Sequence, residues 1–426
     1  MDNRPVKIYC SRDVTRLRYI AGLILGEILG LKWDVVTDKR RLGKCPVINY
    51  SEEDIAGTFK ITPADLLLET GVRNHDIQVS RWKGLPVFFS VTESDLPFDV
   101  FAAAFYLVTR YEEYLDTDPD ECEQFRPSSS VAHRNGFLGI PVVDLWAKEF
   151  AKVLLKKFPT LTFKRNEFKT LLVIDADQPF PEKSFFSSVG NLLMDLKNRK
   201  IILRESQKKK DVQEIDQSDE FDYIIENIKK SDWEVKFFFP VGDHSSSEKH
   251  PSWKNNEYRH LIRKIAETFE TGLKPSNKAS CDYTIISTEL TRLKSIVATD
   301  IFSSRFQPIK TALTNSYLEA YKASIRNDYS MGYPEEPGFR ASIARSFIFY
   351  DLTLDKATDM RIFPFQLMDK SFFRTSGEEN PEIISKLMTE TRNAGGLFVC
   401  IWHNSSLSDC EEMKMRRETF EQMLKS

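Results

Sequence analysis

The sequence contains few of the residues that mark specialised classes of protein. Only 6 of its 426 residues are cysteine and only 6 are histidine. The cysteines are scattered and form no CxxC pair, so the sequence indicates neither a dense disulfide framework nor a cysteine-based metal site. A reducing compartment is the simpler interpretation, and we therefore expect a cytoplasmic protein.

Long apolar runs are also missing. The most apolar segment, residues 19–31, is interrupted by Glu27 and three glycines, and it is shorter than the ~20 apolar residues that a bilayer span needs. We expect a core helix there and no membrane span. The first residues show no basic stretch followed by an apolar run and a cleavage site, so secretory export is not expected.

The charges are nearly balanced. With 60 basic and 63 acidic residues the formal net charge is -3, which offers no positive surface for a phosphate backbone, so nucleic acid is not an expected partner. Hydrophobic residues make up 41% and charged residues 29%, which is typical of a soluble globular protein. The length exceeds that of one ordinary core and favours two domains.

The pattern of the chain changes near residue 166, which predicts domains at 1–165 and 166–426. The first part alternates short apolar runs with helical patterns, and this predicts an α/β domain, although nothing in the sequence gives it a role. Its Arg110, Glu112 and Glu113 fit a solvated or interdomain helix face. The expected strands are 6–10, 33–37 and 46–50, and the expected helices are 15–31, 99–114 and 144–158.

The second part carries apolar strands at long intervals, with helical stretches between them. Strands separated in this way are expected to run parallel, and a closed or nearly closed barrel is one economical arrangement for them. The expected strands are 170–174, 235–239, 301–304, 362–368 and 397–402. Residues 197–221, with a run of lysines and nearby acids, are expected to form a solvated insertion.

Two carboxylates directly follow the first strand of the second part. Residues 171–174 are apolar and lead into Asp175 and Asp177. Acids at the carboxyl end of a barrel strand point toward the site face, but an acid pair after a strand can equally cap a loop. Taken alone, the pair leaves both interpretations open.

Several further segments occur in the order seen in polysaccharide deacetylases of the NodB type. The sequence resembles in particular a group of two-domain bacterial proteins that carry an additional N-terminal domain, and the resemblance spans nearly the whole chain. The segments that carry it are LPFDVFA at 96–102, RYEEY at 110–114, GFL at 136–138, VDLWA at 143–147, IDAD at 174–177, KFFFPVGD at 236–243, GLKPS at 272–276, SR at 304–305, MGY at 331–333, GFRA at 338–341, PFQLMD at 364–369 and WHN at 402–404.

This resemblance implies a distorted (β/α) barrel that hydrolyses an acetamide on a sugar. In such enzymes a divalent metal, held by one Asp and two His, polarises the carbonyl and lowers the pKa of a bound water. A second Asp takes the proton of the water, a late His protonates the leaving amine, and an Arg orients the base. Carried over by position, the roles fall on Asp175 as the base, Asp177 as the metal ligand, Arg340 as the orienting group, Asp369 as the support of the histidine and His403 as the acid.

The sequence departs from this pattern at both metal-binding histidines. Lys274 stands where the pattern has the histidine of a Gly-Leu-His-Pro-Ser segment, and Gln307 stands where it has the histidine of Ser-Arg-Gln-His. A protonated lysine is a poor ligand, and one carboxylate does not replace a three-ligand site. We therefore expect no cofactor and a salt bridge from Lys274 to Asp177. The alternative is a weakly bound divalent metal such as zinc, for which His244 is the best substitute ligand.

Three functions stay open on these residues. The first is a metal-free pseudoenzyme that binds a glycan, such as an acetylated amino-sugar polymer or its precursor, or an unidentified protein partner in bacterial polysaccharide metabolism. The second is an active carbohydrate N-deacetylase in which Lys274 stabilises an oxyanion while Asp175 and His403 transfer protons. The third places the functional surface on the N-terminal domain. Within the barrel, Trp402 either stacks on a sugar ring or packs at the rim, and Arg340 either orients Asp175 or forms a structural ion pair with Asp175 or Asp369.

Overall fold

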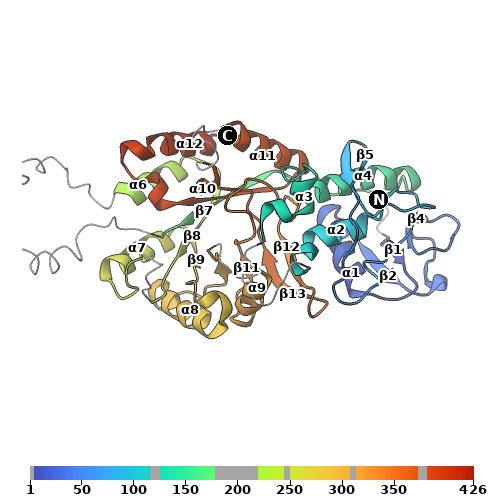
Figure 1. Cartoon of the computed structure of the whole chain (residues 1–426), viewed down its shortest axis with the longest axis horizontal. Helices are drawn as coiled ribbons and strands as arrows, with labels where there is room; N and C mark the ends of the chain where they lie inside the picture. Colours follow the sequence, from blue (N-terminus) through green and yellow to red (C-terminus); the bar gives the residue numbers. More distant parts are fainter. Residues whose placement is uncertain (1–3, 116–124, 178–218, 244–249, 308–312, 373–380) are drawn as a thin grey trace, which may run out of the picture.

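The computed structural model describes residues 4–115, 125–177, 219–243, 250–307, 313–372 and 381–426. Most of the predicted insertion at 197–221, and His244, lie outside the described residues. Within them the chain forms two large, mainly parallel sheets, one before residue 166 and one after it, a two-stranded antiparallel sheet, and helices that cover the large sheets (Figure 1).

The N-terminal sheet has four parallel strands in the order β2-β1-β3-β4. The three strands expected from the sequence are confirmed as β1 (Val6–Tyr9), β2 (Trp33–Val36) and β3 (Val47–Tyr50), and β4 (Phe59–Ile61) is added at the edge. The apolar segment 19–31 is a core helix, as expected. It is made of α1 (Thr15–Ala21) and a π-helical continuation η1 (Gly22–Ile28).

The helix expected at 99–114 ends earlier than the sequence suggested. Asp99 caps α2 (Val100–Val108) by accepting hydrogen bonds from the amides of Phe101 and Ala102, and every residue of this helix is buried. Arg110 then adopts the left-handed conformation, with φ at 56°, and a short 3-10 turn, η3 (Tyr111–Tyr114), follows. The remaining N-terminal elements are the hairpin β5 (Ser80–Trp82) and β6 (Leu85–Val87), α3 (Val131–Arg134) and α4 (Val142–Lys157).

The larger sheet has nine strands in the order β12-β13-β11-β10-β9-β8-β7-β15-β14, all parallel to their neighbours except β12. This is the strand order around a (β/α) barrel. No ladder joins β14 to β12 or β13 in the described part of the chain, so full closure of the barrel stays a prediction. The strands are β7 (Lys169–Asp175), β8 (Glu234–Phe239), β9 (Glu270–Leu273), β10 (Ser303–Ser304), β11 (Asn327–Asp328), β12 (Phe347–Asp351), β13 (Lys356–Ile362), β14 (Leu367–Met368) and β15 (Leu397–His403).

The strand predicted at 362–368 is wrong in one respect, because it is the end of β13, a break, and the short β14. The hairpin of β12 and β13 was not anticipated. The strand β13 carries many polar residues and lacks an apolar pattern, whereas β12 is short and apolar. The helices outside the larger sheet are α6 (Asp219–Ile228), α7 (Asn256–Ala266), α8 (Tyr283–Val297), α9 (Leu313–Lys322), α10 (Asp369–Phe372), α11 (Pro381–Ala394) and α12 (Lys414–Leu424).

One continuous apolar core joins the two parts of the chain. The β12–β13 hairpin packs against the N-terminal helices, where the ring of Tyr350 lies 4.8 Å from that of Tyr19 and 5.2 Å from that of Phe105. The hydroxyl of Tyr19 also donates to the carbonyl of Ile348 at 2.7 Å. Figure 1 shows the hairpin beside α2. Among the described helices, none is both long enough and apolar enough to cross a membrane.

Candidate functional site

The carboxyl ends of the strands in the larger sheet bring five charged or titratable side chains together. Asp175 ends β7, Lys274 follows β9, Arg305 follows β10, Asp369 opens α10 after β14, and His403 ends β15. All five residues are buried, with exposed fractions of 3% or less. Because parallel strands end at the same edge of a sheet, residues far apart in the chain meet there.

Lys274 lies between Asp175 and Asp177, the two acids at the carboxyl end of β7. Its Nζ donates to Asp175 Oδ2 at 2.9 Å and also to Asp177 Oδ1. The salt bridge expected between Lys274 and Asp177 is therefore present, and it extends to Asp175. Of the three side chains, that of Asp177 is the most exposed, at 19%, so the cluster reaches solvent at Asp177.

The surrounding charges keep Asp175 ionised. Burial alone would raise the pKa of this carboxyl, but the charges of Lys274, Arg305 and His403, together with the hydrogen bond from Lys274, outweigh burial and hold the pKa well below its ordinary value. Arg305 contributes from 3.6 Å, measured from its Nη2 to Asp175 Oδ2. Asp175 is therefore a weak base in this arrangement.

Asp369 fixes the ring of His403. One carboxylate oxygen lies 2.8 Å from His403 Nδ1 and the other accepts from the His403 backbone amide at 2.9 Å. With Nδ1 held by Asp369, Nε2 faces the acids, 3.5 Å from Asp175 Oδ2 and 3.7 Å from Asp177 Oδ2. Burial would raise the pKa of Asp369, but the charge and hydrogen bonds of His403 lower it below its ordinary value.

The resemblance implies a divalent metal at this cluster, and some of the residues present could supply ligands for one. Asp175, Asp177 and His403 offer ligand atoms that lie within 4.8 Å of one another. However, the ammonium of Lys274 donates to both carboxylates and places a positive charge in the space that a cation would need. The second substituted position, Gln307, supplies no imidazole. With Lys274 protonated, these residues do not fit a divalent metal.

Arg340 does not occupy the place expected for it. Its Nε and Nη2 donate to the two carboxylate oxygens of Glu113 at 2.9 and 2.8 Å, and its Nη1 donates to the carbonyl of Gly332 at 3.0 Å. It therefore neither orients Asp175 nor pairs with Asp369. The arginine beside Asp175 is Arg305, and its presence in the motif at 304–305 was the only signal for it in the sequence.

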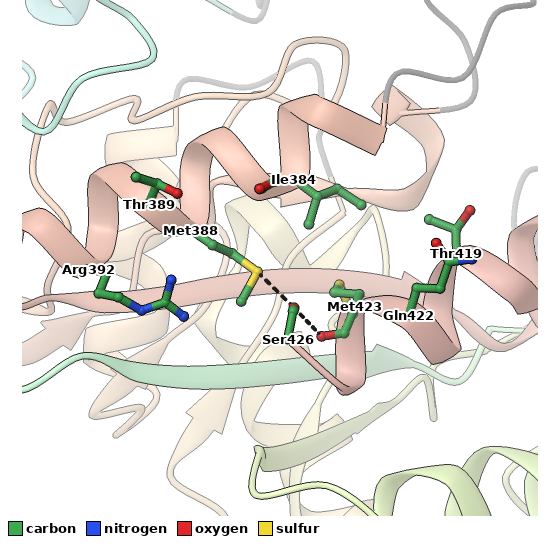
Figure 2. Close-up of a pocket in the computed structure, with 9 residues that line it drawn as sticks. Ile384, Met388, Thr389, Arg392, Thr419, Gln422, Met423 and Ser426 are labelled. Carbon is green, nitrogen blue, oxygen red and sulfur yellow. Dashed lines mark hydrogen bonds between the residues drawn. The ribbon is translucent and has the colours of Figure 1, made fainter.

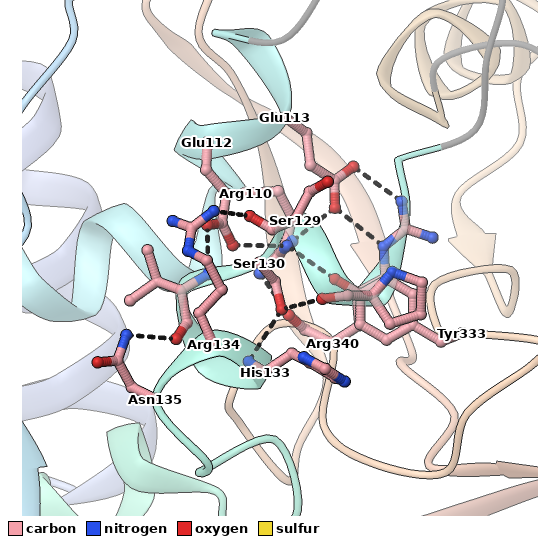
Figure 3. Close-up of polar contacts among 12 residues, drawn as sticks. Arg110, Glu112, Glu113, Ser129, Ser130, His133, Arg134, Asn135, Tyr333 and Arg340 are labelled. Atoms are coloured by element: carbon pink, nitrogen blue, oxygen red, sulfur yellow. Dashed lines mark hydrogen bonds and ion pairs between the residues drawn. The ribbon is translucent and has the colours of Figure 1, made fainter.

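Arg340 belongs instead to an interdomain charge cluster, which consists of Arg110, Glu112, Glu113, Tyr333 and Arg340 (Figure 3). Arg110 donates to Glu113 at 2.7 Å, to Glu112 at 2.9 Å, to the hydroxyl of Tyr333 at 3.2 Å and to the carbonyl of Arg340. Burial alone would raise the pKa of Glu113, but Arg340 and Arg110 lower it to about 2. These N-terminal residues are buried, so the expected solvated face is wrong. Their ion pairs join the N-terminal part of the chain to Arg340.

Trp402 is 1% exposed and packs edge to face against Phe420 of α12, with ring centroids 5.1 Å apart. Successive side chains of a strand point to opposite faces of a sheet. Val399 and Ile401 point to one face of the larger sheet, and Trp402 points to the other face, under α12. Stacking on a sugar ring, one of the two roles expected for Trp402, does not fit this position. The packing role does.

Two acids near the site, the buried Asp328 and the partly buried Glu220, were not anticipated. Asp328 ends β11 and accepts from Ser304 Oγ and from the amide and hydroxyl of Ser330, each at 2.8 Å, while burial raises its pKa to about 6. Glu220 accepts from Asn404 Nδ2 at 2.8 Å, and burial raises its pKa to about 7. A polar residue at the end of a very short strand, as at Asp328, gives too weak a sequence pattern to be recognised.

A separate surface pocket lies between α11 and α12 (Figure 2). Its lining is partly apolar, and Met388 and Met423 face it. None of its lining residues belongs to the strand-end cluster. The lining residues are Ile384, Ser385, Met388, Thr389, Arg392, Thr419, Gln422, Met423 and Ser426.

The N-terminal part of the chain matches a protein family, and about three fifths of the chain is similar to solved structures. Residues 6–159 match a family described as a family of unknown function, DUF7033. A putative polysaccharide deacetylase from Mycobacterium smegmatis is similar at 12% identity, with a TM-score of 0.38, over 62% of this chain and 84% of that one. A mutant of a CE4 family pseudoenzyme with restored enzymatic activity is similar at 12% identity, with a TM-score of 0.28, over 61% of this chain and 65% of that one. Both TM-scores are low, so neither similarity establishes a function. No curated protein matches the sequence.

Proposed function

We propose that this chain is a metal-free, deacetylase-like pseudoenzyme that binds a carbohydrate with acetylated amino sugars. The observation that carries the proposal is the position of Lys274, whose ammonium bonds both Asp175 and Asp177 inside the barrel. A lysine so placed bonds both acids where a metal would sit and offsets one of their two charges, but it is not a Lewis acid that could bind a water molecule and lower its pKa. The motifs shared with polysaccharide deacetylases support the carbohydrate as the ligand.

The rival proposal is an N-deacetylase with a modified mechanism. It is favoured by the pair of Asp369 and His403, because a histidine held through Nδ1 presents Nε2 as a proton donor toward the acids. Two observations count against it. The pKa of Asp175 is held too low for an efficient base, and the Lys274 ammonium is already engaged by two carboxylates.

The test is to measure metal content and acetate release on the same preparation. Elemental analysis after mild dialysis should find far less than one zinc, cobalt or nickel ion per chain, because Lys274 and Gln307 supply no imidazole. Acetate release from chitin or peptidoglycan fragments should stay at background with and without added zinc. Turnover that disappears in Asp175→Asn or His403→Ala would establish the rival, and one tightly held metal per chain would contradict both.

Carbohydrate binding needs its own measurement. Isothermal titration with oligomers of N-acetylglucosamine should give saturable heat for the wild-type protein. As a control, the Lys294→Ala variant should give the same heat as the wild type, since Lys294 makes an exposed ion pair with Asp300 away from the cluster. Absence of binding to every acetylated amino-sugar oligomer would reject the carbohydrate part of the proposal and leave the metal-free part standing.

A further inference from the structure

Three sulfur-containing side chains meet where α11 and α12 pack on β15, and we call them the sulfur cluster. Met388 comes from α11, Met423 from α12 and Cys400 from β15. All three residues are buried, with exposed fractions of 3% or less. None of them belongs to the strand-end cluster, and the proposed function uses none of them. The sulfur cluster is therefore a separate feature of the molecule.

The spacing of the sulfur atoms suits ligands of one ion. Cys400 Sγ lies 3.6 Å from Met423 Sδ. Two sulfurs that each bind one ion at about 2.3 Å, with tetrahedral geometry, lie roughly 3.8 Å apart, so this pair needs almost no movement to share an ion. Met388 is linked to Met423 through Ser426, whose hydroxyl oxygen lies 3.4 Å from Met388 Sδ and 2.7 Å from the carbonyl oxygen of Met423.

The pocket between α11 and α12 gives access to the sulfur cluster, because Met388 and Met423 line it (Figure 2). Its volume is about 210 Å³, many times the ~10 to 15 Å³ that one water molecule needs. Cys400 is not part of the lining and is reached through Met423. The one charged residue of the lining, Arg392, is exposed, and its guanidinium lies 4.4 Å from the ring centroid of Phe168. Methionine side chains are flexible, so their sulfurs can turn toward an ion without displacing the helices.

The types of ligand select a soft ion with a single charge. Thioethers and thiolates favour Cu(I), whereas zinc is bound by imidazole, thiolate and carboxylate groups. Burial raises the pKa of the Cys400 thiol well above its ordinary value, so this sulfur carries its proton at neutral pH. An ion that binds here displaces that proton to the solvent, and the thiolate then offsets one positive charge. A divalent ion would leave an uncompensated charge in an apolar interior, and Cu(I) leaves none.

We propose that Met388, Met423 and Cys400 form a binding site for one Cu(I) ion. The two thioethers meet the ion at the pocket, and the Cys400 thiolate completes the site. Copper keeps its oxidation state, and the only exchange of bonds is the S–H bond of Cys400 for a bond from sulfur to copper. The proposed function concerns the strand-end cluster, which stays without a metal, so each proposal can fail without the other.

The first experiment measures the affinity of the full chain for Cu(I) without oxygen, by competition with a colorimetric Cu(I) chelator. The buried Cys10 and Cys400 are kept. The remaining cysteines are replaced by serine so that they cannot bind copper, namely Cys45, Cys122, Cys281 and Cys410. This background protein should bind one Cu(I) ion per chain.

Loss of one sulfur should weaken the site. Met388→Leu and Met423→Leu should each lower the affinity for Cu(I) by at least about tenfold, a loss seen even for groups that only orient a ligand, and Cys400→Ser should lower it further. Leucine has nearly the volume of methionine, so these variants should fold, and circular dichroism melting checks that they do. Met415→Leu, which changes an exposed methionine of α12, should keep the affinity of the background protein.

The second experiment identifies the atoms bound to copper and needs only the background protein. X-ray absorption at the copper edge should show sulfur neighbours at about 2.3 Å and no nitrogen or oxygen neighbours. Nitrogen or oxygen neighbours would overturn the proposal, because they would place the ion elsewhere on the chain. Unchanged affinity in a folded Met388→Leu or Met423→Leu variant would overturn it as well, and so would a folded background protein that binds no stoichiometric copper.

Discussion

Two groups of buried charges in this protein differ in how completely they are satisfied. In the interdomain charge cluster, Arg110 and Arg340 use their guanidinium nitrogens on Glu112, Glu113, Tyr333 and two carbonyls. In the strand-end cluster, Lys274 is paired, but Asp175 Oδ1 and two nitrogens of Arg305 are not. Buried charges that are fully paired serve to fix two parts of a chain together, whereas each unpaired buried atom costs free energy unless a water molecule or another group bonds it.

Removal of Glu113 should have the largest effect on stability. Glu113→Ala leaves two buried guanidinium groups without their shared partner, and breaking a buried pair in this way costs about 3 to 5 kcal/mol of unfolding free energy. Urea unfolding measures the loss. Glu226→Ala, which removes an exposed ion pair with Lys230, should leave stability nearly unchanged. Equal effects of the two variants would mean that the interdomain charge cluster does not lock the parts together.

Removal of Lys274 should have a somewhat smaller effect, because Asp177 is partly exposed. Lys274→Ala removes the ammonium that bonds both Asp175 and Asp177, leaving only Arg305 beside Asp175, and should cost roughly 3 kcal/mol. Added zinc should raise the Tm of this variant but not that of the wild type. Lys274→His combined with Gln307→His should bind zinc more tightly, as measured by equilibrium dialysis. A Lys274→Ala variant as stable as Lys294→Ala, with no response to zinc, would contradict the view that the lysine stands in for a cation.

Acid should weaken the interdomain charge cluster. Glu113 has a pKa of about 2 in the folded protein and 4.5 as its ordinary value, so its stabilisation is present above about pH 4.5 and is lost as the pH falls toward 2. The difference in unfolding free energy between wild type and Glu113→Gln should therefore shrink between pH 5 and pH 2.5, both values being approximate limits of that window. Urea unfolding at several pH values gives this difference. A constant difference over the window would show that Glu113 is not held as a carboxylate by the arginines.

The smallest effect is expected at Trp402. Trp402→Phe should reduce stability by about 1 to 2 kcal/mol, since it shortens a buried ring that packs on Phe420, and should leave binding of acetylated oligomers unchanged. Titration calorimetry on this variant and on Arg305→Met shows whether the outer face of β15 or the strand-end cluster contributes to oligomer binding. A loss of affinity larger than threefold in Trp402→Phe would show that Trp402 contributes to oligomer binding.

Several features of the site could be predicted from the sequence because they depend on short segments. The acids Asp175 and Asp177 follow an apolar strand, and such a strand ends at the edge of a sheet wherever the rest of the chain goes. The substitution of Lys274 for a histidine can be read directly from a five-residue motif. The salt bridge of Lys274 to Asp177 follows from these two facts, because a buried carboxylate needs a positive partner.

The identity of the arginine beside Asp175 could not be predicted in this way. Both Arg305 and Arg340 lie in recognisable motifs, and the choice between them depends on Glu113, which is 227 residues from Arg340 in the chain. The charges at Glu113 fit a solvated face as well as an interdomain one, because a short segment with a charge pattern does not reveal whether another part of the chain will cover it. The break in the helix at the left-handed Arg110 was also not evident from the sequence.

The sequence by itself therefore determined the α/β character of both parts, the strands that end in acids, and the loss of the two histidines. Only the tertiary structure decided that Arg340 belongs to the interdomain charge cluster, that Arg305 stands beside Asp175, and that Trp402 points under α12. The physical reason is the separation along the chain over which each effect acts. Strand periodicity and the identity of a residue act within a few positions of the chain, whereas the partner of a buried charge is set by which segments the folded core brings into contact.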